Sequence, residues 1–333
     1  MTDGAVSGLA GARELAGGLA SAGGGHVRCI LLYGSHLHRT NPDRYSAHDF
    51  IVLVDDYRGF YAALKDVGQL RKSVSLMSIM AHILPPNVIA YSPPEDAGRI
   101  AKCSVVNRPH LSRALGRQPR DHYLLGRLVQ RVAFVWVASD QDREWVETVM
   151  AGARGRVLTW MAPYLTEPVD ADGLGRRILE VCYSGEFRPE AADRHQHTFE
   201  AQADHFLKVL GPVFSDAERR GLMVAKAGKY RLTSSPAAWE VFRWRWHFMR
   251  SKVRNGMRTL KHTVTFDKWL PYIVRKAERH SGKTIELTWP ERRLPLLFLW
   301  PRAIKFLLSR PGRDIRSWST AIRMTREGCS SAW

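Results

Sequence analysis

Two short apolar runs, residues 27–32 and 49–56, constrain the fold of this chain more than any other feature. The first run, VRCILL, ends at Tyr33-Gly34-Ser35, and the second, DFIVLVDD, opens on Asp49. Runs of about four to eight branched and aromatic residues are typical of buried strands. A polar loop, residues 36–44, separates them. The pattern therefore predicts two strands of a sheet, with a Gly-Ser turn at the end of the first.

The flanking segments predict a small mixed sheet with helices around it. Residues 57–69 place apolar side chains on one helical face, and residues 87–91 and 100–106 have the composition of further strands. From about residue 118, apolar residues recur every three or four positions. That spacing predicts helices over residues 123–138, 145–163, 174–183 and 199–210. Residues 226–232 contain a glycine turn, which is compatible with the hairpin of a winged-helix-like module.

Positive charge is concentrated at the C-terminal end of the chain. The formal net charge is +18, and residues 241–333 hold 21 Lys and Arg against 6 Asp and Glu, a net of +15. The first 240 residues are therefore close to neutral, at +3. Such asymmetry indicates a polyanionic partner, either nucleic acid or an anionic membrane.

Several protein classes are disfavoured by composition. The four cysteines lie far apart, without the spacing of a zinc site, and so few cysteines favour a reducing compartment. No uninterrupted apolar run reaches the length of a transmembrane helix. Residues 1–25 are rich in Ala and Gly with little positive charge, unlike a signal or transit peptide. We expect a cytoplasmic protein whose N-terminus is flexible or a weak helix, ending at the glycines 23–25.

The Gly-Ser turn and Asp49 have the layout of the DNA polymerase β-like nucleotidyltransferases. Glycine lets the backbone come close to a triphosphate, and a carboxylate oxygen is the hard ligand that Mg²⁺ prefers. That superfamily usually has a second carboxylate two residues after the first, where this chain has Ile51. Asp55 is about 20 Å further along an extended strand, too far to share a metal with Asp49. A strand-ending turn and a strand-start aspartate remain alternative readings of these residues.

Five segments in the same order resemble motifs of the mitochondrial translocator assembly and maintenance family, the soluble-type phosphatidate cytidylyltransferases. They are residues 33–35 (YGS), 49–51 (DFI), 98–102 (GRIAK), 123–128 (YLLGRL) and 183–188 (YSGEFR). The family's own pattern lacks the second carboxylate at position 51. Two departures are His36-Leu37-His38 after the turn and a poor match over residues 192–195; residues beyond about 205 show no match.

The resemblance implies that CTP and phosphatidate react, with Mg²⁺, to give CDP-diacylglycerol and pyrophosphate. By analogy Tyr33, Gly34 and Ser35 hold the triphosphate and Asp49 holds the metal. Lys102 would offset phosphate charge, and Glu186 would supply a second carboxylate. Arg127 and Arg188 are candidates for bidentate phosphate contacts. Plainer readings stay open: Lys102 as a surface lysine, Arg127 in a structural ion pair, and Glu186 paired with Arg188. The histidines at 36, 38, 195 and 197 match no ligand pattern and are read as exposed loop residues.

The basic region mixes aromatic and apolar residues with its charges, as an interfacial membrane anchor does. Residues 242–248 alternate aromatic and basic side chains, and residues 294–308 are apolar with embedded basic residues. The residues predicted to meet the membrane are Trp244, Trp246, Phe298, Trp300, Arg302 and Lys305. A buried helix with a solvated basic face is the alternative, and nucleic acid is the less favoured partner.

The predicted fold is α+β, with four segments. Residues 1–25 form the N-terminus and 26–117 a nucleotidyltransferase-like mixed sheet with flanking helices. Residues 118–240 form a helical or winged-helix-like domain, and 241–333 a basic C-terminal tail that docks on membranes. The predicted function is a peripheral-membrane phosphatidate cytidylyltransferase. The alternatives are a catalytically inactive nucleotidyltransferase-fold protein that binds membrane or nucleic acid through its tail, and a transferase acting on a different acceptor.

Overall fold

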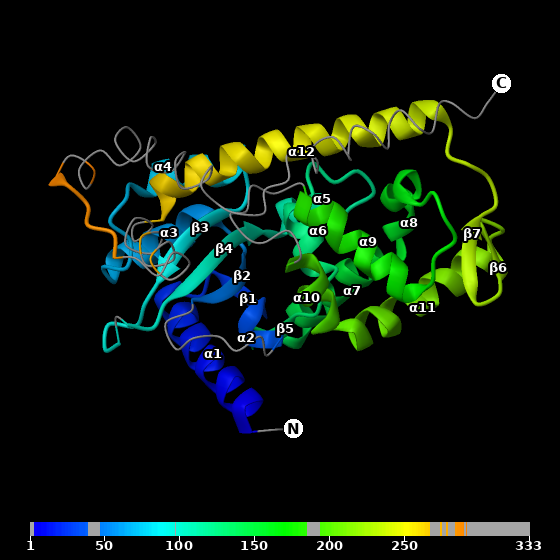
Figure 1. Ribbon diagram of the computed structural model, residues 1–333. Coiled ribbons are helices and arrows are strands. Elements are labelled where there is room, and N and C mark those ends of the chain that lie inside the picture. Colours follow the sequence, from blue (N-terminus) through cyan, green and yellow to red (C-terminus); the bar gives the residue numbers. More distant parts are fainter. Residues whose placement is uncertain are drawn as a thin grey trace. The chain divides into compact units, whose positions relative to one another are not determined.

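The computed structural model describes residues 3–38, 47–96, 98–184 and 194–266, with a few positions between 274 and 291 (Figure 1). The chain divides into two compact units. One unit comprises residues 1–188 and 195–272, and it holds every strand and helix named below except Arg194, the first residue of α10. The other comprises residues 189–194 and 273–333, where few positions are described; there the Thr288 N–H donates to Glu291 at 2.8 Å.

A five-stranded mixed sheet lies at the centre of the first unit. Its strands run in the order β3-β4-β2-β1-β5. Only β2 and β4 pair in parallel; the other neighbours are antiparallel. The strands are β1 (Val27–Tyr33), β2 (His48–Val54), β3 (Asn87–Tyr91), β4 (Ala101–Asn107) and β5 (Ala133–Val137). The predicted α+β class with a mixed sheet is confirmed.

Helices α1 (Asp3–Ala22), α3 (Tyr57–Asp66) and α4 (Val74–Ile83) share one apolar cluster with one face of the sheet. Leu15 and Leu19 of α1 are buried there, because Leu and Ala recur at three- and four-residue spacing. The residues 1–25 therefore contribute to the core, which the prediction of a weak helix did not anticipate. Helix α1 ends before Gly24 and Gly25, whose φ angles of 61° and 80° break the helix as predicted.

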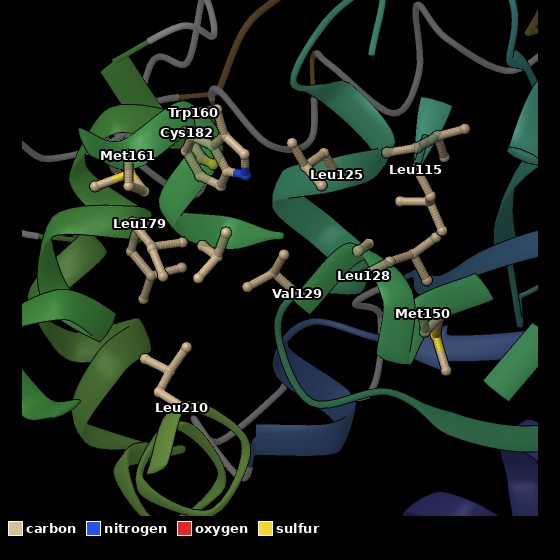
Figure 2. Close-up of a cluster of buried hydrophobic side chains, with 14 of the residues drawn as sticks. Leu115, Leu125, Leu128, Val129, Met150, Trp160, Met161, Leu179, Cys182 and Leu210 are labelled. Atoms are coloured by element: carbon tan, nitrogen blue, oxygen red, sulfur yellow. The ribbon is translucent and has the colours of Figure 1, made fainter. Parts of the chain in front are cut away.

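The opposite face of the sheet is covered by the second apolar cluster, part of which Figure 2 shows. Leu125, Met150, Leu179 and Leu210 belong to four different helices and pack in one cluster. The helices that follow β4 in the chain, up to the hairpin, are α5 (Arg108–Ala114), α6 (Tyr123–Leu128), α7 (Asp140–Gly155), α8 (Val157–Met161), η1 (Ala162–Tyr164), α9 (Ala171–Ser184), α10 (Arg194–Glu200) and α11 (Ala203–Arg219). The predicted hairpin is present as β6 (Met223–Lys226) and β7 (Lys229–Leu232).

One helix prediction was wrong. Residues 123–138 were expected to form a single helix, but only α6 is helical and β5 follows it. β5 pairs with β1, so the segment predicted to be helical supplies an edge strand of the sheet. The run AFVWV is short, apolar and partly β-branched, and such a run suits a strand or a buried helix equally well from periodicity alone. Pairing with β1 decides between them.

Helix α12 (Ala238–Thr265) is 28 residues long and contacts both β3 and η1. It is the long yellow helix in Figure 1. Arg258 and Lys261 on its inner side donate hydrogen bonds to backbone carbonyls of the segment before β3. Thr265 donates to the carbonyl of Val88 at 2.9 Å. Hydrogen bonds from polar side chains therefore hold this helix against the edge of the sheet at β3.

Two histidines, the buried His122 just before α6 and the half-buried His247 of α12, make stability depend on pH. The His122 N–H donates to Ser251 Oγ at 2.9 Å, and its ring lies 5.0 Å from that of His247. Burial, with His247 nearby, lowers the pKa of His122 to about 3, and burial, with Arg250 nearby, lowers that of His247 to about 4. Both rings are thus neutral in the folded chain above these values.

We expect the chain to lose stability as the pH falls from about 6.5 toward 4. In that window the unfolded chain binds protons that the folded chain excludes, so the free energy of unfolding decreases. Each fully buried histidine contributes up to about 1.4 kcal/mol per pH unit. Melting temperatures measured at pH 7.5, 6 and 5 check this. The variant His197→Asn, at an exposed position, should reproduce the wild-type profile, whereas a flat profile would contradict the expectation.

Candidate functional site

Three of the predicted site residues form one row across the sheet. Tyr33 of β1 pairs with Asp49 of β2, and Asp49 pairs with Lys102 of β4. Cross-strand partners point to the same side of a sheet. Leu31 and Ile51, each two residues from the row on its own strand, belong to the second apolar cluster, part of which Figure 2 shows. The row therefore lies on the face of the sheet that this cluster covers. A hydroxyl, a carboxylate and an ammonium group thus stand next to one another where β1 ends and β2 and β4 begin.

Gly34 fits the turn beside this row for a steric reason. Its φ of 81° lies in the left-handed region, which side chains rarely adopt. A Cβ at this position would stand 3.1 Å from Asp49 Oδ2. The carboxylate therefore lies directly against the glycine backbone, and Ser35 follows as the first residue of the short helix α2 (Ser35–His38). The Gly-Ser turn and Asp49, 14 positions apart in the sequence, form one surface.

Arg127 and Tyr123 of α6 extend the row toward the helices. The Arg127 Nε donates to Tyr33 Oη at 3.3 Å and its guanidinium lies 3.7 Å from the centre of the Tyr123 ring. Tyr123 Oη lies 3.3 Å from Ser104 Oγ, one position further along the same face of β4. Arg127 is thus buried and held at the row by two aromatic residues.

The electrostatic environment of these tyrosines is uneven. Burial, and next the Asp49 carboxylate, raise the pKa of Tyr33. Burial also acts to raise the pKa of Tyr123, but Arg127, Lys102 and the bond to Ser104 outweigh it, and that pKa is lowered. Burial and the Asp49 carboxylate therefore dominate at Tyr33, whereas the nearby cations dominate at Tyr123.

His262 of α12 lies in the same positive environment. Burial, and then the charges of Lys102, Lys261, Arg258 and Arg127, lower its pKa to about 2. Its Nε2 is buried and has no hydrogen-bond partner among the described residues. A neutral imidazole with an unsatisfied nitrogen beside several cations is suited to an anionic ligand that supplies the missing bond. The contribution of α12 was missed, because nothing in its sequence indicates which helix face meets the sheet.

The residues at the row fit a magnesium ion of the kind that a nucleotide brings. Mg²⁺ is commonly held by one or two carboxylates together with substrate phosphates and water. Asp49 Oδ2 lies against the open backbone of Gly34, where a side chain would obstruct it. Ile51 is buried in the core and supplies no second carboxylate. No group of three or more His, Cys, Asp or Glu side chains that could hold a metal is found among the described residues.

Other predicted site residues fall outside this row or outside the described positions. Glu186 and Arg188 lie within residues 185–193, which the structure does not describe. His36 stacks on His48 with ring centres 3.9 Å apart, and His197 is exposed on α10. His195 is partly buried, and the side chain of His38 is not described. These histidines lie in the helices α2 and α10 rather than in loops.

The membrane prediction for Trp244 was wrong, because this side chain is buried in the apolar cluster. Trp246 is exposed. Residues 242–248 are helical, so positions two apart lie about 200° apart around the axis and alternation does not keep one kind of residue on one face. Phe298, Trp300, Arg302 and Lys305 lie outside the described residues. In the described part of the chain, no helix combines the length and the apolarity needed to cross a bilayer.

Comparisons with known proteins add no relative. No protein family matches the chain, and none of the curated proteins is significantly similar to it.

Proposed function

We propose that the chain is a nucleotidyltransferase that transfers the cytidylyl group of CTP to phosphatidate, giving CDP-diacylglycerol and pyrophosphate. One observation carries the proposal: the row of Tyr33, Asp49 and Lys102, with Gly34 against the carboxylate and Arg127 at its inner end. A carboxylate for a metal, an open glycine turn and two cations are the groups that a triphosphate requires. The resemblance of five sequence segments to the cytidylyltransferase family suggests which nucleotide and which acceptor the chain uses.

Two parts of the fold can be assigned more narrowly than the α+β class, and both assignments are compatible with the proposal. We assign the sheet to the nucleotidyltransferase type, since a Gly-Ser turn ends one strand and the carboxylate lies on its antiparallel neighbour. We assign α11 with the β6–β7 hairpin to a winged-helix-like module, since a helix leads directly into a two-stranded wing. Both assignments belong to the proposal.

The reaction makes one P–O bond and breaks another. An oxygen of the phosphatidate phosphate attacks the α-phosphorus of CTP, and the bond from that phosphorus to the β-phosphate oxygen breaks as pyrophosphate leaves. No general base is required, because a phosphate monoester has its second pKa near 6 and is already ionised. The protein must bring two polyanions into line and offset their charge.

Each residue of the row has a role in that alignment. The backbone of Gly34 and the hydroxyl of Ser35 would hold the triphosphate, with the Tyr33 hydroxyl at the edge of the row. Lys102 and Arg127 would offset negative charge that shifts to the leaving group. Asp49 would hold Mg²⁺, which would offset the negative charge of the phosphates. Glu186 and Arg188 keep the roles that the resemblance implies.

Phosphatidate resides in a bilayer, so the proposed enzyme is a cytoplasmic protein that associates peripherally with an anionic membrane surface. The +15 charge of residues 241–333 supports this, because each basic residue near an anionic surface adds about 1 kcal/mol of attraction. The near-neutral remainder of the chain contains the proposed active site.

A specific observation favours the second candidate, a protein of the same fold without activity that binds membrane or nucleic acid. Asp49 is the only carboxylate of the row among the described residues, and Ile51 fills the place of a second one. An assay of transfer separates the two candidates. A transferase that uses another acceptor would be revealed by the same assay.

The test is incubation of the purified full-length chain with α-labelled CTP, MgCl₂ and phosphatidate. We expect labelled CDP-diacylglycerol on thin-layer chromatography, and no product when EDTA is present. Parallel reactions with ATP, and with glycerol 3-phosphate as acceptor, define both substrates. CTP that stays intact under every lipid and metal condition would refute the transferase and favour the inactive candidate.

A further inference from the structure

Helix α12 presents an apolar stripe to solvent along its whole length. Eight large apolar side chains on it are between 40% and 69% exposed. They are separated by three or four positions, which at about 100° per residue places them within an arc of about 80°. We call this set the outer stripe: Trp239, Phe242, Trp246, Met249, Val253, Met257, Leu260 and Val264.

The opposite face of α12 is polar and buried, which reverses the usual pattern of a surface helix. Apart from Trp244, which lies in the apolar cluster, the buried residues of α12 are polar or charged: Ser251, Asn255, Arg258, Lys261 and Thr265. Arg258 donates to Asp121 and to the carbonyl of Pro85, both at 2.8 Å, and Lys261 donates to the carbonyl of Pro86 at 2.9 Å. Rotating the helix to bury the stripe would break these bonds, so the stripe is held facing outward.

Basic side chains flank the N-terminal half of the outer stripe on both sides. At about 100° per residue, Arg243 and Arg250 fall along one border, and Arg245 and Lys252 along the other. Glu240 is the only acidic residue of α12. Arg243, Arg245 and Arg250 are exposed, and Lys252 is partly exposed. An apolar stripe between two rows of cations complements a surface that has anionic groups above an apolar layer.

The charges decide among the occupants that an apolar helix face can have. A second copy of α12, in either direction, would bring two sets of arginines together, and like charges across a helix pair are unfavourable. Single-stranded nucleic acid would satisfy the arginines and stack on aromatic rings. However, the five residues of the stripe after Trp246 are Met, Val or Leu, which offer no stacking surface. An anionic lipid bilayer satisfies both the cations and the aliphatic positions.

We propose that the outer stripe is a docking surface for an anionic bilayer, with α12 lying in the plane of the membrane. At about 1.5 Å per residue the helix is about 42 Å long, and its apolar side chains enter the boundary between headgroups and acyl chains. Its basic borders contact lipid phosphates. The proposal rests on the proposed function only in its purpose, which is to bring the active site to phosphatidate; docking itself requires no turnover.

The test uses the full-length chain and sucrose-loaded vesicles of two compositions, phosphatidylcholine alone and phosphatidylcholine with 30% phosphatidylglycerol, which is not the substrate. We expect sedimentation with the anionic vesicles and little with the neutral ones. The double variant Val253→Glu/Leu260→Glu should bind at least tenfold more weakly. The matched control is Leu207→Glu/Val224→Glu, which adds the same charge at exposed apolar positions outside the stripe and should bind like wild type.

Circular dichroism and the melting temperature check that both double variants remain folded. Equal vesicle binding by the two variants would overturn the proposal. The proposal would also be overturned if the wild-type protein failed to sediment with anionic vesicles. It would likewise be overturned if the wild-type protein, but not the stripe variant, formed a dimer in light scattering or bound single-stranded nucleic acid. Turnover of water-soluble dihexanoyl phosphatidate by the wild-type chain is assayed separately. Its absence would count against the proposed function and leave the vesicle result standing.

Discussion

Replacing Asp49 with asparagine is expected to reduce CDP-diacylglycerol formation by about 100-fold or more. Asparagine has nearly the same shape, so its contact with Gly34 and its place between Tyr33 and Lys102 are kept. What is lost is the negative charge that would hold Mg²⁺ against the phosphates. The measurement is the initial rate as a function of MgCl₂ concentration for wild type and variant.

The matched control is Asp55→Asn, one residue beyond the far end of the same strand. Asp55 is exposed and its Oδ1 lies 2.9 Å from His26 Nδ1, away from the row. We expect this variant to retain at least about half of the wild-type rate, since removing a surface charge outside the site changes little. An Asp49→Asn protein with the wild-type melting temperature and more than half of the wild-type rate would contradict the role of Asp49.

Replacing Asp121 with alanine is expected to lower the free energy of unfolding by about 3–5 kcal/mol, because it breaks a buried ion pair. Arg258 is only 1% exposed and donates to Asp121 at 2.8 Å; Arg254 donates to the same carboxylate at 3.0 Å. Although burial acts to raise it, Arg258 and Arg254 hold the pKa of Asp121 below its ordinary value. Without the carboxylate, Arg258 would keep a buried charge with only neutral partners among the groups described around it.

Urea unfolding followed by circular dichroism measures this loss. Asp204→Ala is the control, since Asp204 pairs with Arg131 at the surface and its side chain is 79% exposed. We expect that change to cost less than about 1 kcal/mol. Adding Arg258→Met to Asp121→Ala removes the stranded charge and should recover part of the loss. A loss below 1 kcal/mol for Asp121→Ala would show that the ion pair does not fasten α12.

Most elements of the sheet could be predicted from local pattern. The runs at residues 27–32 and 49–54 are strands because branched apolar residues suit buried extended backbone, whereas Asp55 and Asp56 of the predicted strand lie beyond its end. The hairpin at residues 226–232 could be predicted from its turn, where Gly228 has a φ of 76°. β5 was misassigned because five apolar residues have no periodicity that separates strand from helix, and only pairing with β1 makes them a strand.

The candidate site was predictable in part. Tyr33, Gly34, Asp49 and Lys102 were identified by motif, and the register of the sheet brings them together. His262 and Tyr123 could not be predicted as neighbours of Lys102, because no local pattern relates residues so far apart in the chain. Their proximity depends on how α6 and α12 pack, which involves many contacts distant in sequence.

The amino-acid sequence alone determined the strands other than β5, the Gly-Ser turn with its carboxylate, and the concentration of basic and aromatic residues after position 240. These depend on backbone preference and composition, which act between near neighbours. Only the tertiary structure decided which way α12 faces. Trp244 and Trp246 look alike in sequence, but burial of Arg258 and Lys261 against Asp121 and backbone carbonyls turns Trp244 inward and leaves Trp246 exposed. On a long helix, the buried polar contacts decide which face turns toward the core, and that face decides whether a given side chain is buried or exposed.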